Sequence, residues 1–174
     1  MERQVHGFQY QKMVVLRESL SEDENYTGKW DAFNKTLNLP CSVKCISQTG
    51  SIDFGDFTRQ TQIQSDFILY VGFWRGSKTN IVEEYKVLIN KDTWLTYFGD
   101  TEIIKEMLEE MKSISNSRED DPKWKAFRLK WKDRYGDSIV SLRFKRDHKK
   151  QKRIQCGITK KNFLEVVLPG NQVI

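Results

Sequence analysis

The sequence predicts an α/β (α+β) fold in which a central mixed β-sheet is flanked by helices. An almost wholly apolar run at residues 67–74 is typical of a strand that is buried on both faces. Apolar side chains recur with helical spacing over residues 102–115 and 122–135. Short alternating segments between these runs indicate further strands, and this order of elements packs helices on the faces of a sheet.

The first part of the chain is expected to form a helix and two short strands. Residues 6–20 place apolar side chains at helical intervals. Residues 29–33 alternate aromatic and polar side chains, and residues 41–46 form a second alternating segment. Residues 51–60 resemble a helix start, because Ser51 or Asp53 can cap a first turn that is rich in acids.

The remaining elements build a helical and then a basic region. Residues 81–89 read as a strand after a glycine-containing turn. The helix over 122–135 begins with proline and carries lysines and arginines on its outer face. Two further strands, 139–144 and 154–158, flank a strongly basic stretch. We therefore expect a basic C-terminal helix followed by a β-hairpin.

Length and composition predict a single globular domain over residues 1–174. Hydrophobic residues make up 38% and charged residues 30%, which excludes a disordered chain or a membrane protein. The first residues lack the apolar core of a signal peptide, so we expect a cytoplasmic protein with three reduced cysteines. Within the domain, residues 1–115 are expected to form a core portion and residues 116–174 a basic portion.

The charges are distributed unevenly along the chain. Residues 1–121 contain 14 Lys and Arg against 20 Asp and Glu, whereas residues 122–162 contain 15 against 3. A basic segment on an otherwise acidic chain indicates a polyanionic partner.

The basic hairpin is the main candidate for contact with DNA, because a two-stranded ribbon fits the major groove. The candidate residues there are Arg143, Lys145, Arg146, Lys149, Lys150, Gln151, Lys152, Arg153 and Gln155. Arg59 and Gln60 are further candidates. The alternative for all of them is a solvated charged surface.

Asp31 and Lys44 are the candidate catalytic pair. Each falls in one of two neighbouring short strands, so their side chains can meet on one surface of a sheet. Carboxylates hold a divalent cation that polarises a phosphate and activates water, and a lysine stabilises the negative charge that develops. The alternative is a surface acid and a solvated strand lysine.

This arrangement resembles the PD-(D/E)xK nucleases, the superfamily of many type II restriction endonucleases. The resemblance rests on Asp31, on the strand Ser42-Val43-Lys44, and on the expected helix and apolar strand that follow. It covers residues 6–89. It implies a restriction-endonuclease-like fold, with Asp31 and the Val43 carbonyl as ligands of Mg²⁺, Mn²⁺ able to substitute, and Lys44 as the catalytic lysine.

The chain departs from this pattern at two positions. Trp30 stands where the family has proline, and Ser42 stands where it usually has an acidic residue. Some restriction enzymes resemble this chain in having Ser-x-Lys, with the carboxylate supplied by the next helix. Asp56 is the favoured substitute, and the alternatives are Asp53 and Glu18.

The sequence therefore predicts a Mg²⁺-dependent endonuclease that acts on double-stranded DNA, restriction-like and homodimeric, since two symmetric sites cut both strands. Two alternatives stay open. One is a structure-selective nuclease such as a junction resolvase. The other is a non-catalytic nucleic-acid-binding protein that uses the basic segment 143–153.

Overall fold

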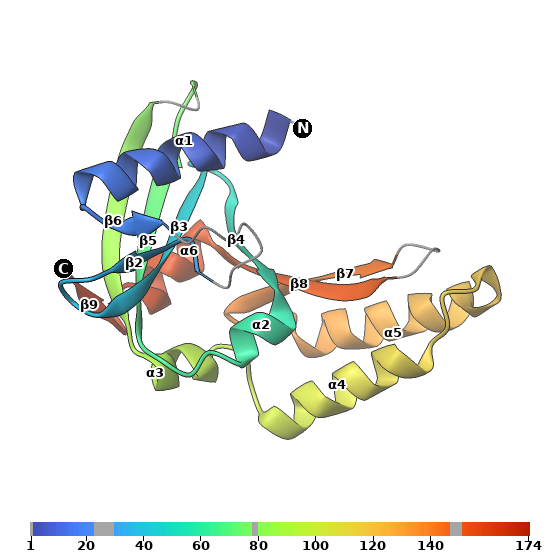
Figure 1. The fold of residues 1–174 in the computed structure, drawn as a ribbon. Coiled ribbons are helices and arrows are strands. Elements are labelled where there is room, and N and C mark those ends of the chain that lie inside the picture. The colour runs from blue at the N-terminus through green and yellow to red at the C-terminus, as the bar shows by residue number, and fades with distance from the viewer. Residues whose placement is uncertain (1, 23–29, 78–79, 147–150) are drawn as a thin grey trace. The chain divides into compact units, whose positions relative to one another are not determined.

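The computed structural model describes residues 2–22, 30–77, 80–146 and 151–174 (Figure 1). The chain forms two compact units. The first comprises Met1–Ile52, Gln64–Trp94 and Thr159–Ile174, and the second comprises Asp53–Ile63 and Leu95–Ile158. This division differs from the expected boundary after residue 115, because residues 53–63 and 95–115 group with the basic region and the last residues group with the first unit.

The first unit is built on a mixed sheet of six strands. After the helix α1 (Glu2–Arg17) come β1 (Ser21–Glu22), β2 (Ala32–Asn34), β3 (Leu39–Ser47), β5 (Phe67–Trp74), β6 (Ile81–Ile89) and β9 (Gln172–Val173). Their order in the sheet is β1-β2-β3-β5-β6-β9. The strands β3 and β5 are parallel, and the other neighbours are antiparallel. The predicted mixed central sheet is confirmed.

Helices cover both faces of this sheet. α1 packs Tyr10 and Val14 against Val43 and Tyr70 on one face. On the other face Phe73 contacts Phe163 of the short π-helix η2 (Phe163–Val167), with ring centroids 6.2 Å apart. The short helices α3 (Lys91–Thr96) and α6 (Lys160–Asn162) complete the unit. Because β5 is covered on both faces, seven of its eight residues are buried, as its apolar sequence predicts.

The second unit packs helices against a smaller sheet. Its elements are β4 (Ser51–Asp56), α2 (Phe57–Thr61), α4 (Thr101–Ser113), the 3₁₀-helix η1 (Arg118–Asp120), α5 (Asp121–Arg134), β7 (Val140–Arg146) and β8 (Lys152–Thr159). The sheet order is β4-β8-β7. α5 buries Trp124, Phe127 and Trp131, and Phe127 meets Phe144 of β7 edge to face at 5.3 Å. The bounds of α4, α5 and the β7–β8 hairpin lie within a few residues of those predicted from the sequence.

The helix expected over residues 51–60 is wrong in its first half. Residues 51–54 alternate between exposed and buried, with Ile52 and Phe54 inside, so this segment is the strand β4. The helix α2 starts only at Phe57, and its cap is Asp56 rather than Ser51 or Asp53. The acids that suggested a first helical turn are therefore partly the exposed face of a strand.

Within the described ranges, no helix combines the length and apolar character needed to cross a bilayer.

Candidate active site

The backbone of Asp31 is held from two sides. Its amide donates a hydrogen bond to the carbonyl of Cys41 at 2.9 Å, and its carbonyl accepts one from the Gln11 side chain of α1 at 3.1 Å. The neighbouring Trp30 packs on Phe67, with ring centroids 5.0 Å apart. Asp31 thus stands just before β2, and not within a strand as expected, at a position fixed by β3 and α1.

One carboxylate oxygen of Asp31 accepts three hydrogen bonds from β3. Oδ2 lies 2.7 Å from the amide nitrogen of Val43, 3.0 Å from Nζ of Lys44 and 3.1 Å from Oγ of Ser42. The Asp31 and Lys44 side chains keep 29% and 24% of their surface exposed. The structure therefore brings together Asp31, Ser42 and Lys44 at a place that solvent reaches.

The opposite oxygen, Oδ1 of Asp31, accepts no hydrogen bond from any residue that the structure describes. The Val43 carbonyl points to the same side of β3 as the Val43 amide, because a strand residue directs both groups toward one neighbour. On that side the β2–β3 pairing ends at Cys41, so no β2 residue pairs with Val43. Two oxygens of the kind that Mg²⁺ prefers thus lie at the same end of the hairpin.

Glu18 does not join this group. Its carboxylate lies 2.7 Å from Nζ of Lys86 and 3.1 Å from Arg17. Lys86 sits over the ring of Tyr70, which belongs to the core beneath α1, whereas Lys44 alternates with Val43 and points to the other face. The hydrogen bond from Lys86, opposed by burial and aided by Arg17, lowers the pKa of Glu18. The expectation that Glu18 is a metal ligand is therefore corrected: it forms an ion pair on the opposite face of the sheet.

Asp53 and Asp56 belong to the second unit, and both have contacts there. Asp53 forms an ion pair with Arg143 at 2.6 Å and accepts a hydrogen bond from the amide of Gly55. Asp56 caps α2 by accepting from the amide of Arg59 at 3.1 Å. In the described part of the chain, no three His, Cys, Asp or Glu side chains are grouped so as to hold a metal ion. The assignment of either acid to the metal stays a prediction.

Substitution of Asp56 separates the capping role from the predicted metal role. Asparagine caps a helix about as well as aspartate, whereas alanine costs about 0.5–2 kcal/mol of stability. We expect Asp56→Ala to lower the free energy of unfolding by that amount and Asp56→Asn to leave it nearly unchanged, as measured by urea denaturation. If Asp56 is a metal ligand, Asp56→Asn also loses Mg²⁺-dependent cleavage of DNA. Full cleavage by this folded variant would show that Asp56 caps α2 and does not bind the metal.

The β7–β8 hairpin places four of the predicted DNA contacts on one face. Arg143 pairs across the strands with Gln155, and Lys145 pairs with Arg153. These residues alternate with inward-facing Phe144 and its neighbours, so their side chains project from the same side.

Two other basic residues of the hairpin serve internal contacts. The Arg146 side chain is only 2% exposed, forms an ion pair with Asp121 at 3.1 Å, and donates to the carbonyl of Ser117. Lys152 donates to the carbonyls of Met111, Lys112 and Ile114 at the end of α4. Their prediction as DNA contacts is corrected, because each charge satisfies the end of a helix or a turn.

The other residues predicted to contact DNA lie between β7 and β8 in the sequence and on α2. Lys149 and Lys150 lie outside the described residues, and Gln151 is exposed at the start of the following segment. Gln60 donates its side-chain amide to the carbonyl of Phe54 at 3.0 Å, which fixes α2 against β4. Arg59 is exposed on the same short helix, and its role as a DNA contact stays a prediction.

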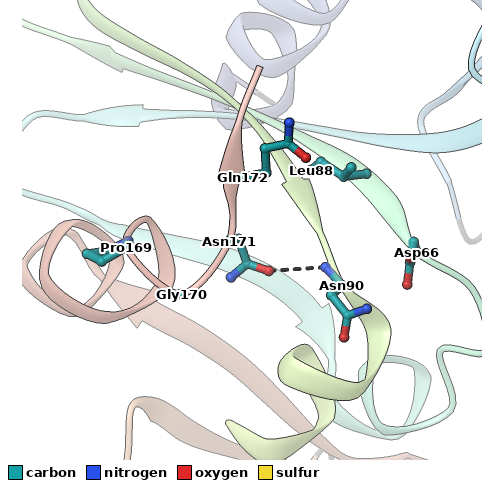
Figure 2. Close-up of a pocket in the computed structure, with 7 residues that line it drawn as sticks. All are labelled: Asp66, Leu88, Asn90, Pro169, Gly170, Asn171 and Gln172. Atoms are coloured by element: carbon teal, nitrogen blue, oxygen red, sulfur yellow. Dashed lines mark hydrogen bonds between the residues drawn. The ribbon is translucent and has the colours of Figure 1, made fainter.

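A separate depression of about 520 Å³ lies in the first unit (Figure 2). Its polar side chains come from Asp66, Asn90, Asn171 and Gln172. Asn171 accepts a hydrogen bond from the amide of Asn90, and Asp66 accepts one from the amide of Lys91. These groups fix the loops around α3 and β9, and neither Asp31 nor Lys44 lines the depression. Its lining residues include no cation and no Ser, Thr or Cys nucleophile, so Asp31 and Lys44 remain the candidate catalytic residues.

Comparisons with protein-family models, with curated proteins and with solved structures find no match for this chain.

Proposed function

We propose that this chain is a Mg²⁺-dependent endonuclease of the PD-(D/E)xK type that cleaves double-stranded DNA, with its catalytic centre at Asp31 and Lys44. The observation that carries the proposal is the set of three hydrogen bonds from Ser42, Val43 and Lys44 to one oxygen of Asp31. The order of elements supports it, since a helix and the β2–β3 hairpin precede β5, which runs parallel to β3.

Each residue of the centre has a role that follows from its contacts. Asp31 and the Val43 carbonyl offer oxygens to the cation, and Mg²⁺ needs few protein ligands because it keeps several waters. The bound cation supplies a Lewis acid and lowers the pKa of a coordinated water. Ser42 and the Val43 amide hold Oδ2, which orients the carboxylate toward its ligand. Lys44 places a positive charge where the phosphate becomes more negative.

Plasmid cleavage tests the proposal directly. Purified protein is expected to nick or linearise supercoiled plasmid in Mg²⁺ or Mn²⁺ and to leave it intact in EDTA. A parallel assay on a linear duplex and a four-way junction separates restriction-like cleavage from junction resolution. Analytical ultracentrifugation tests the proposed homodimer, which would present two centres to the two strands. No cleavage of any of these DNAs in either metal would refute the nuclease proposal.

A non-catalytic nucleic-acid-binding protein is the second candidate. Ser42 in place of an acid favours it, as does the lack of a metal-holding group of three side chains among the described residues. Isothermal titration with Mg²⁺ and Mn²⁺ discriminates between the two candidates. Binding that is lost in Asp31→Asn supports the nuclease, whereas no binding of either ion supports the non-catalytic protein.

A further inference from the structure

A basic groove of about 460 Å³ runs between α5 and β7 in the second unit. Five of its lining residues are cationic: Lys125, Arg128 and Lys132 from α5, and Arg143 and Lys145 from β7. All five are exposed, and no acidic residue lines the groove. A cleft lined by one sign of charge concentrates ligands of the opposite sign.

The two flanks of α5 differ in how their charges are balanced. On one flank Lys130 and Arg134 form ion pairs with Glu106 of α4, and Lys130 also pairs with Glu110. On the groove flank, Lys125, Arg128 and Lys132 form no ion pair with any residue in the described part of the chain. No described carboxylate therefore neutralises the charges of this second flank.

The spacing of these cations suits a chain of phosphates. Lys125, Arg128 and Lys132 span about 10.5 Å of helix, at about 1.5 Å per residue. One DNA strand carries a phosphate about every 3.4 Å along the duplex axis, so the row matches the length of about three phosphate-to-phosphate intervals along that axis. On the other wall, Arg143 and Lys145 lie two residues apart on a strand, which separates them by about 6.8 Å. Arg143 is already paired with Asp53 at 2.6 Å, so the cations without an ion pair to a described residue are mainly those of α5.

Apolar groups also line the groove. Leu129 of α5 is 61% exposed, although it projects from a helix whose other large apolar side chains are mainly buried. Leu142 and Phe144, both half-buried, add apolar surface from β7. Cations beside an apolar floor can contact phosphates and the sugars or bases attached to them.

We propose that the α5–β7 groove binds the phosphodiester backbone of a nucleic acid, and that Lys125, Arg128 and Lys132 provide most of the contacts. This inference rests on the proposed function in its choice of ligand, since it assigns to the nuclease a substrate-binding surface separate from Asp31 and Lys44. The sequence suggested the tip of the hairpin for this role. Arg146 and Lys152 of that hairpin are used internally, whereas the flank of α5 presents cations that form no ion pair with a described residue.

The test compares two triple variants with the same change in net charge. The groove variant is Lys125→Gln, Arg128→Gln and Lys132→Gln, and glutamine preserves helix propensity. The control variant is Lys12→Gln, Lys35→Gln and Lys161→Gln, which removes three exposed lysines of the first unit. Fluorescence anisotropy in EDTA measures binding of a labelled 20-base-pair duplex and of one of its strands at several salt concentrations. Circular dichroism melting verifies that both variants fold.

The groove variant is expected to bind at least about tenfold more weakly than wild type. If the duplex is the ligand, the slope of log K against log salt falls in magnitude by about 2.7 for three lost phosphate contacts, and by about 2.1 if the single strand is the ligand. The control variant is expected to keep wild-type affinity and slope. The stronger ligand identifies which form of nucleic acid occupies the groove.

Equal binding by wild type and the folded groove variant would overturn the inference and leave the nuclease proposal standing. Conversely, a groove-dependent loss of binding by a protein that never cleaves DNA would support the groove and refute the nuclease. Binding of vesicles of four parts phosphatidylcholine to one part phosphatidylserine, without binding of either nucleic acid, would also overturn the inference.

Discussion

Asp31→Asn and Lys44→Ala are each expected to reduce Mg²⁺-dependent cleavage by at least about 10²-fold, which is the usual cost of removing one electrostatic contributor to a transition state. Asparagine keeps the shape of Asp31 but removes the charge that attracts the cation. Alanine at position 44 removes the ammonium that lies 3.0 Å from Oδ2. Initial rates of plasmid cleavage measure both effects, and anisotropy in EDTA is expected to show unchanged binding of DNA.

The same sheet provides a matched control for this prediction. Lys86 and Glu18 form an ion pair at 2.7 Å with similar exposure, but on the face covered by α1. Lys86→Ala therefore removes a comparable pair without touching the proposed centre, and we expect cleavage within about twofold of wild type once the variant is folded. Equal losses in Lys86→Ala and Lys44→Ala would show that Lys44 acts through stability alone.

Gly72→Ala is expected to lower the free energy of unfolding by about 1–3 kcal/mol, the usual cost of overpacking a core. A Cβ at Gly72, in the middle of β5, would lie 2.6 Å from Cζ and 2.7 Å from Cε2 of Tyr10. The ring has little room to move, because it is buried and its hydroxyl donates to Glu84 at 2.7 Å. Arg17 holds Glu84 in turn at 2.7 Å. Urea denaturation measures the effect.

Two further variants attribute the loss to this contact. Gly7→Ala makes the same chemical change in α1, where nothing lies within 4 Å, and is expected to stabilise the protein by about 0.5–1 kcal/mol. In a Tyr10→Ala background, Gly72→Ala is expected to cost much less than in wild type, which a double-mutant cycle measures. Additive losses in that cycle would contradict a clash between Gly72 and Tyr10.

The clash expected between an alanine at position 72 and Tyr10 also bears on the proposed centre. Tyr10 and Gln11 are adjacent in α1, and Gln11 donates to the carbonyl of Asp31. A displacement of α1 is therefore expected to weaken the hydrogen bond from Gln11 to the carbonyl of Asp31. We infer that the seating of α1 on β5 contributes to the position of the carboxylate as well as to stability.

Elements with a strong local pattern were predictable from the sequence. The apolar strand 67–74 and the helices near 102–115 and 122–135 agree with β5, α4 and α5 to within a few residues. Several short segments were not predicted. α3, η2 and β9 contain six residues or fewer, and they depend on packing against the sheet more than on their own periodicity.

The sequence by itself determined most kinds of element and the meeting of Asp31 with Lys44, because both follow from local alternation and from the short turn between two adjacent strands. The strand β4, which the sequence predicts as the start of a helix, is an exception. Only the tertiary structure decided which charges are used elsewhere. Glu18 pairs with Lys86, and Arg146 and Lys152 satisfy carbonyl groups of helices and turns. Such pairings join residues 26 to 68 positions apart in the chain, so they depend on sheet register and helix packing, which no local pattern encodes.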